Sequence, residues 1–241
     1  FNKDILLKNK FLKNIHEGEK CFIIGNGLSV NEIDMSLLAK EYTFGSNFLN
    51  YHKDFNKLNI NYYSLVSSAS RLKHVDSMVT YVNPEIHSEK DIQPWVNKKI
   101  TPYRYSSKPE IFFNKIDSDL NNNVSIFLGH SLKKYIEKHQ LFINKEVYYS
   151  KPLKPILEAD TQKIDLTKRI TFHEGVVFFM ISHALYMGFK ELYLIGCDYT
   201  YEPTREYHFY NQLCISKSIN KDIAIQWSKK ISKANNFELF N

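Results

Sequence analysis

Residues 21–31 read CFIIGNGLSVN. The apolar run stops at Gly25 and Gly27, which flank an asparagine, and amphipathic sequence follows. This pattern predicts a buried strand over 20–24, a glycine-rich turn, and a helix over 29–40. A strand, a glycine-rich turn and a helix in this order form the opening unit of a doubly wound α/β sheet.

The glycine-rich turn allows two interpretations. Glycines without a Cβ atom let a phosphate approach the backbone, and the free N–H groups at the start of the following helix attract anions. Asn26 and Ser29 could then donate to a phosphate or a ribose, with Ser29 and Glu32 forming a capping box. Val30 replaces the third glycine of the dinucleotide fingerprint, and no Walker A lysine follows. The alternative is a simple β–α turn.

The remaining chain continues the alternation of strands and helices. One further predicted strand ends near 46–47, and others cover 62–66, 77–82, 123–130, 191–196 and 237–240. The other predicted helices cover 1–17, 175–187 and 220–233. We therefore expect one α/β domain over 1–241, with a mainly parallel Rossmann-like sheet flanked by helices. The weakly periodic, proline-punctuated stretch 83–168 is expected to form a mobile insertion or lid. The chain lacks an initial Met, which suggests a fragment of a longer protein.

Polar loops follow four of these strands. In a parallel sheet the ligand binds beyond the carboxyl ends of the strands, so these loops are expected to form the site. They are Gly25–Ser29, Ser46–Asn47, Ser67–Ser70 and Asp198–His208.

Composition limits the partners. The chain has 32 Lys and Arg against 26 Asp and Glu, a net charge of +6, and no nucleic-acid-binding motif. The excess charge fits either solvated faces or attraction to nucleotide phosphates or membrane lipids. No apolar run could span a bilayer, and the basic, amphipathic start is not expected to be a signal peptide. Cys21, Cys197 and Cys214 form no CxxC pair, which predicts buried thiols in a reducing, cytoplasmic compartment and no structural zinc.

The segment CDYTYEPTREYHFYNQ carries the best candidates for chemistry. His208 could act as a general base, and the hydroxyls of Tyr201 and Tyr207 could donate to a departing phosphate without a metal. Asp198 begins this segment at the end of a predicted strand. The alternative is an aromatic-rich surface loop with a solvated histidine.

Other polar residues have a structural and a chemical interpretation. Arg169 could pair with a carboxylate or a phosphate. Glu174 is better placed to cap a helix than to catalyse, and His183 is expected in the core. Asp117 and Asp119 form a DxD pattern, which in some glycosyltransferases holds a divalent cation; here a solvated loop is favoured, because no apolar strand precedes the pair.

Two blocks resemble a known family. FIIGNGLSVNEIDMSLL with FGSNFLNY, and later RITFHEGVVFFMISHALYMGFKELYLIGCDYTY, are similar to the bacterial sialyltransferases of glycosyltransferase family forty-two. They are also similar to related glycosyltransferase-like domains, namely the flagellin-glycosylation accessory factors and an archaeal pterin diphosphokinase. The resemblance covers about the first 70 residues and 168–241.

The resemblance implies an inverting, metal-independent transfer of sialic acid, Kdo or another nonulosonic acid from a CMP-activated donor. The acceptor would be a bacterial capsule or lipopolysaccharide glycan or glycolipid, and no cofactor is needed. Its implied catalytic residues are His208, Tyr201, Tyr207 and Arg169. Its implied nucleotide- and donor-binding residues are Gly25, Asn26, Gly27, Ser29, Asn47, Ser67, Thr171, Gly175 and Asp198.

Two further functions stay open. One is a magnesium-dependent nucleotide diphosphokinase, which would use Asp117, Asp119 and Asp198. The other is a non-catalytic module of a polysaccharide-assembly protein. A location at the inner face of the cytoplasmic membrane, with peripheral association, and a homo-oligomer are compatible with each function.

Overall fold

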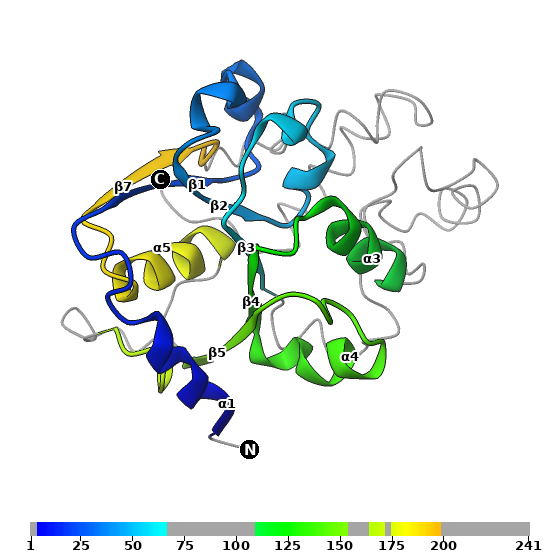
Figure 1. Cartoon of the computed structure of the whole chain (residues 1–241), viewed down its shortest axis with the longest axis vertical. Coiled ribbons are helices and arrows are strands. Elements are labelled where there is room, and N and C mark those ends of the chain that lie inside the picture. The colour runs from blue at the N-terminus through cyan, green and yellow to red at the C-terminus, as the bar shows by residue number, and fades with distance from the viewer. Residues whose placement is uncertain (1–3, 67–108, 154–163, 172–174, 199–241) are drawn as a thin grey trace, which may run out of the picture.

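The computed structural model describes residues 4–66, 109–153, 164–171 and 175–198, and they build a seven-stranded sheet (Figure 1). The strand order is β6-β5-β4-β3-β2-β1-β7, and every neighbouring pair is parallel. The strands are β1 Lys20–Ile24, β2 Tyr42–Ser46, β3 Tyr62–Leu65, β4 Ser125–Gly129, β5 Val147–Leu153, β6 Arg169–Thr171 and β7 Glu191–Ile195. The predicted α/β, Rossmann-like class is confirmed.

Helices cover both faces of this sheet. The α-helices are α1 Asp4–Leu7, α3 Pro109–Asp119, α4 Lys133–Lys138 and α5 Val176–Tyr186. The 3-10 helices are η1 Lys8–Leu12, η2 Leu28–Glu32, η3 Met35–Leu38, η4 Leu49–Tyr51, η5 Phe55–Lys57 and η8 His130–Leu132. Figure 1 shows α5 on one side of the sheet and α3 and α4 on the other.

Alternation along the strands divides the core into two layers. In β4, Ile126 and Leu128 pack with α3 and α4, while Phe127 between them packs with α5. In β1, Ile24 joins the first layer and Ile23 joins the second. Because both faces are covered, even the polar residues of the inner strands, such as Thr43, Ser46 and Ser64, are buried.

The strand order reverses at β1. The chain passes from β1 through β2 to β6 in one direction along the sheet, and β7 then pairs with the other side of β1. In such sheets the crevice beyond the carboxyl ends of the strands at the reversal point is where ligands bind. The loops after β1, β2, β3 and β7 are therefore the ones to examine for a site.

The strands were predicted more accurately than the helices. The strand over 20–24 is confirmed as β1, and the strands ending near 46 and beginning at 62 are confirmed as β2 and β3. The single helix over 29–40 is wrong, because two 3-10 helices replace it with extended backbone at Ile33 between them. The capping box at Ser29 is also wrong, since Gly27 precedes η2, whereas Asp34 caps η3 by accepting from the Ser36 N–H.

The lid expected over 83–168 is wrong for much of its length. Residues 109–153 supply α3, α4, β4 and β5, and β4 and β5 lie inside the sheet. The rest of that range, 83–108 and 154–163, lies outside the described residues, apart from the short segment that leads into β6. The predicted strand over 77–82 and everything predicted beyond residue 198 also lie outside them.

Near the amino end, the helix expected over 1–17 is shorter than predicted. In the described residues it consists of α1 followed directly by η1, and turns lead from there into β1. The buried amide of Asn9 fastens this segment to the sheet by donating to the carbonyl oxygens of Tyr149 (2.8 Å) and Leu166 (2.7 Å). No helix of the described residues is long and apolar enough to cross a bilayer.

Cys21 is a buried free thiol, as predicted, and burial raises its pKa to about 12. Cys197 is a half-buried free thiol whose pKa burial also raises. Both thiols therefore stay protonated and unreactive at neutral pH. Cys214 lies outside the described residues.

Candidate site at the carboxyl ends of the strands

The loops after β1 and β7 are in direct contact. The Gly25 N–H donates to the Ile195 carbonyl (2.7 Å), and the Gly27 N–H donates to the Gly196 carbonyl (2.7 Å). A Cβ atom on Gly25 would stand 2.3 Å from the Gly196 oxygen, far inside contact distance. The first glycine of the Gly-Asn-Gly turn is therefore required by the neighbouring strand, whether or not a ligand binds.

Asp198 adds a further contact between the loops after β1 and β7. Its carboxylate accepts from the Ser29 N–H (2.9 Å) and from the Ser29 hydroxyl. A Cβ atom on Gly27 would lie 2.5 Å from this carboxylate. Ser29 and Asp198, both expected to bind a nucleotide, thus bind each other in this structure. The negative charge of Asp198 lies at the first turn of η2, where a phosphate was expected.

A row of buried polar side chains crosses the ends of β1, β2 and β3. Asn26 is 6% exposed, and Ser46 and Ser64 are fully buried. The Asn26 amide donates to the Ser46 carbonyl (3.1 Å) and hydroxyl (3.2 Å). Ser46 and Ser64 are direct partners in the parallel register.

Two atoms of this row have no hydrogen-bond partner: Asn26 Oδ1 and Ser64 Oγ. Buried polar atoms have a hydrogen-bond partner in the large majority of cases. Two unpaired atoms at the ligand edge of a sheet therefore indicate that a hydroxyl, an amino group or a water supplies the missing hydrogen bonds. The sequence selected Asn26 and offered Ser64 or Ser67 on the third strand, of which Ser67 was assigned to the site; the structure places Ser64 opposite Ser46.

Asn47 continues the row after β2. Its backbone is in the left-handed region (φ 52°), which asparagine tolerates better than most residues. Its N–H donates to the Ser64 carbonyl (3.3 Å), and its own carbonyl accepts from the buried Tyr63 hydroxyl (2.9 Å). The backbone of Asn47 is thus held on both sides beside Ser64.

Arg169 and Thr171 lie elsewhere, in β6 at the far edge of the sheet. Four strands separate β6 from β1, which at about 4.8 Å between neighbours is roughly 24 Å. Arg169 is exposed and begins its strand. The described structure does not bring it together with the Gly25–Ser29 loop.

Gly175 has a conformational role of its own. It precedes α5 with φ 137°, a backbone conformation that only glycine adopts readily.

Several expected site residues lie outside the described residues, so the structure does not test the roles expected of them. They are His208, Tyr201, Tyr207, Ser67 and Glu174.

The DxD pair is not in a solvated loop, as the sequence suggested, but at the end of α3. Asp117 accepts from Lys145 Nζ (2.5 Å) and from the Phe142 N–H (3.1 Å). Asp119 accepts from Lys115 Nζ (3.0 Å) and from the Asn50 amide (2.7 Å). Both carboxylates therefore hold the helix to neighbouring segments. Within the described ranges, no three His, Cys, Asp or Glu side chains cluster as metal ligands would.

His183 lies in the core, as predicted, and is fully buried in α5. Its Nδ1–H donates to the Phe179 carbonyl (2.7 Å), so Nε2 is left to accept from the Ser150 hydroxyl (2.9 Å). Burial lowers the pKa of the imidazole to about 4. The neutral ring is therefore a structural element of the core.

The fold and the polar row define an α/β protein of the Rossmann-like type with a candidate ligand site at the carboxyl ends of β1, β2 and β3. A comparison with protein-family models found no family that matches the chain, and a comparison with curated proteins found no match.

Proposed function

We propose that the carboxyl edge of β1, β2 and β3 binds a nucleotide, and that the protein is a metal-independent inverting glycosyltransferase. The donor would be a CMP-activated nonulosonic acid such as sialic acid or Kdo, and the acceptor a bacterial surface glycan. The observation that carries the nucleotide site is the pair of unpaired buried polar atoms, Asn26 Oδ1 after β1 and Ser64 Oγ in β3, on either side of the end of β2.

The choice of CMP and of sugar transfer rests on the resemblance of the two sequence blocks to the sialyltransferases. In that proposal His208 deprotonates the acceptor hydroxyl, and the hydroxyls of Tyr201 and Tyr207 donate to the CMP phosphate as it leaves. In this proposal hydrogen bonds, and not a cation, stabilise the charge of the leaving phosphate. The Asp198 carboxylate at this edge already accepts from Ser29.

The diphosphokinase alternative has less support. It would need Asp117, Asp119 and Asp198 to hold Mg²⁺, and each of these carboxylates already accepts a hydrogen bond from a side chain around it. Lysine ammonium groups on Asp117 and Asp119 would have to be displaced before either could bind a cation. We therefore favour the transferase.

Thermal-shift titration with CMP, CDP, UDP, GDP and ATP, each with and without Mg²⁺, tests the proposal. A ligand that binds only the folded state stabilises it by about 2.7 kcal/mol at a hundredfold excess over its dissociation constant. Stabilisation by CMP without metal is expected. Stabilisation only by ATP or a nucleoside diphosphate with Mg²⁺ would contradict the transferase, and no shift with any nucleotide would favour the non-catalytic module.

Ser64→Ala gives a sharper test of the orphan atoms. Removing a buried hydroxyl that has no partner is expected to raise the free energy of unfolding by about 1 kcal/mol in the absence of ligand. The same change is expected to weaken CMP binding about three- to tenfold, because the ligand loses a hydrogen bond. Chemical denaturation measures the first effect and calorimetric titration the second.

Ser46→Ala is the matched control, since Ser46 is buried beside Ser64 but its hydroxyl accepts from Asn26. This variant should lose stability, not gain it. A Ser64→Ala protein that binds CMP as tightly as the parent would show that the nucleotide does not contact this row.

A further inference from the structure

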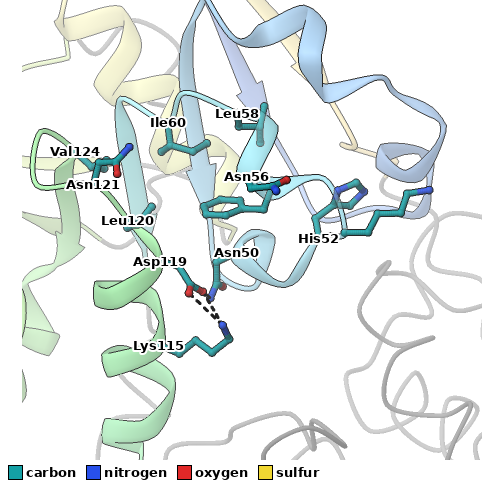
Figure 2. A pocket seen from close by; sticks show the side chains of 12 residues that line it. Asn50, His52, Asn56, Leu58, Ile60, Lys115, Asp119, Leu120, Asn121 and Val124 are labelled. Carbon is teal, nitrogen blue, oxygen red and sulfur yellow. Dashed lines mark hydrogen bonds and ion pairs between the residues drawn. The ribbon is translucent and has the colours of Figure 1, made fainter.

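A hollow lies away from the carboxyl edge, between the β2–β3 connection and the end of α3 (Figure 2). One wall is formed by the segment that includes η4 and η5, and the other by the last turn of α3 and the turn that leads into β4. Its volume is about 430 Å³, within the range of small-molecule sites. All of its lining residues belong to the described part of the chain.

The hollow combines an apolar surface with amide groups. The apolar part is formed by Phe55, Leu58, Ile60, Leu120 and Val124. Three asparagines, Asn50, Asn56 and Asn121, supply the amides, and Figure 2 shows them on both walls. Each amide side chain carries both a donor and an acceptor group.

Two of the three charged groups that line the hollow, Lys115 and Asp119, neutralise each other. Lys115 Nζ lies 3.0 Å from Asp119 Oδ2, and the Asn50 amide donates to the same carboxylate oxygen (2.7 Å). Lys53 also lines the hollow and is exposed, and burial lowers the pKa of His52, which is therefore neutral at pH 7. Apart from the exposed Lys53, the polar lining thus consists of a neutral ion pair and amides, which suits an uncharged ligand rich in hydroxyl groups.

Sugars have this chemistry. Each hydroxyl of a sugar ring both donates and accepts hydrogen bonds, as amides and a lysine–carboxylate pair require of a ligand. The C–H groups of the ring form an apolar patch that can pack on a phenyl group such as that of Phe55. We propose that this hollow is a saccharide-binding site for an uncharged sugar unit. The inference goes beyond the nucleotide site, because no residue of the hollow belongs to the polar row at the carboxyl edge.

The hollow is also connected to that edge. The Asn50 N–H donates to the Tyr63 hydroxyl (3.3 Å), which in turn donates to the Asn47 carbonyl (2.9 Å). Tyr63 is fully buried, so this chain of hydrogen bonds is shielded from water. A sugar held in the hollow would thus lie on the same β2–β3 connection that supplies Asn47 to the proposed nucleotide site.

The test is saturation-transfer difference NMR on the full chain without nucleotide, using lactose, maltose and N-acetylglucosamine as probes and phenyl phosphate as an anionic comparison. Binding of at least one of the sugars is expected, with the anion bound more weakly. Because no nucleotide is present, the result does not depend on the transferase proposal.

Adjacent asparagines supply the variants. Asn121→Ala should weaken the bound sugar about three- to tenfold, since an exposed hydrogen-bonding group is lost without a change in the core. Asn122→Ala is the control, because Asn122 is also exposed but does not line the hollow. Phe55→Leu, which keeps apolar volume and removes the ring, should also weaken binding.

Three results would overturn the proposal: no binding of any of the three sugars, tighter binding of phenyl phosphate than of the sugars, or equal sugar binding by the Asn121→Ala and Asn122→Ala proteins. Loss of sugar binding in Asn121→Ala alone, with CMP binding unchanged, would support a saccharide site separate from the nucleotide site.

Discussion

Gly25→Ala is expected to lower the free energy of unfolding by about 3 kcal/mol, at the upper end of the cost of overpacking. The new methyl group would lie 2.3 Å from the Gly196 oxygen, 2.9 Å from the Gly196 carbonyl carbon and 3.0 Å from Cys197 Sγ. Two of these three atoms are backbone atoms in a strand end that is hydrogen-bonded to β1, so they cannot move aside without breaking the β1–β7 pairing. Urea or guanidinium denaturation of the ligand-free protein measures the loss.

Gly18→Ala is the matched control. Gly18 has a positive φ of 84°, but nothing lies within 4 Å of where its Cβ atom would be. That variant should cost only the left-handed backbone penalty, about 1 kcal/mol. If Gly25 served only to admit a phosphate, Gly25→Ala would leave the ligand-free protein as stable as the parent and would lower CMP affinity alone. That result would contradict the close packing of the loops after β1 and β7.

Acidification should remove about 3 kcal/mol of stability through His183. Burial lowers the pKa of this imidazole to about 4 in the folded protein, against 6.5 in an unfolded chain. Between these values the unfolded chain binds the proton and the native protein does not, so stability rises with pH. The contribution is fully present above about pH 6.5 and is lost as the pH falls towards 4, at about 1.4 kcal/mol for each unit of pKa difference.

Denaturation curves at several pH values between 4 and 7.5 test this expectation. His183→Gln should be less stable than the parent at pH 7.5 and should show a shallower loss of stability on acidification. His139→Gln is the control, since His139 is half-buried at the end of α4 and its substitution should leave the steep loss intact. Parallel stability–pH curves for the parent and the His183→Gln protein would contradict the assignment.

The strands were predictable because their signal is local. KCFII and ELYLI are short apolar runs bounded by charged or turn residues, and both are strands with those limits. Gly188, directly after the helix predicted over 175–187, follows α5 with φ 92°, as a helix-ending glycine should. Patterns of this kind depend on neighbours within a few residues, so one sequence is enough to read them.

Other features depended on residues far apart in the chain. Asp119 is bound by Asn50, 69 residues earlier, and Asp117 by Lys145, 28 residues later. Without those partners, the sequence showed only a DxD pattern among polar residues, which was interpreted as a solvated loop. The lid expected over 83–168 failed for the same reason, because the weakly periodic stretch contains β5, whose place in the sheet is set by its pairing with β4.

By itself, the sequence determined the fold class and the position of the Gly25–Ser29 and Ser46–Asn47 loops, because the spacing of apolar residues and glycines specifies which segments form strands and where they stop. Only the tertiary structure decided what the selected residues do. It paired Ser29 with Asp198, placed Arg169 across the sheet from the Gly25–Ser29 loop, and aligned Ser46 with Ser64 beside Asn26. Contacts such as these form between strand ends that are distant in sequence, and their geometry exists only once the parallel sheet has set the register of its strands.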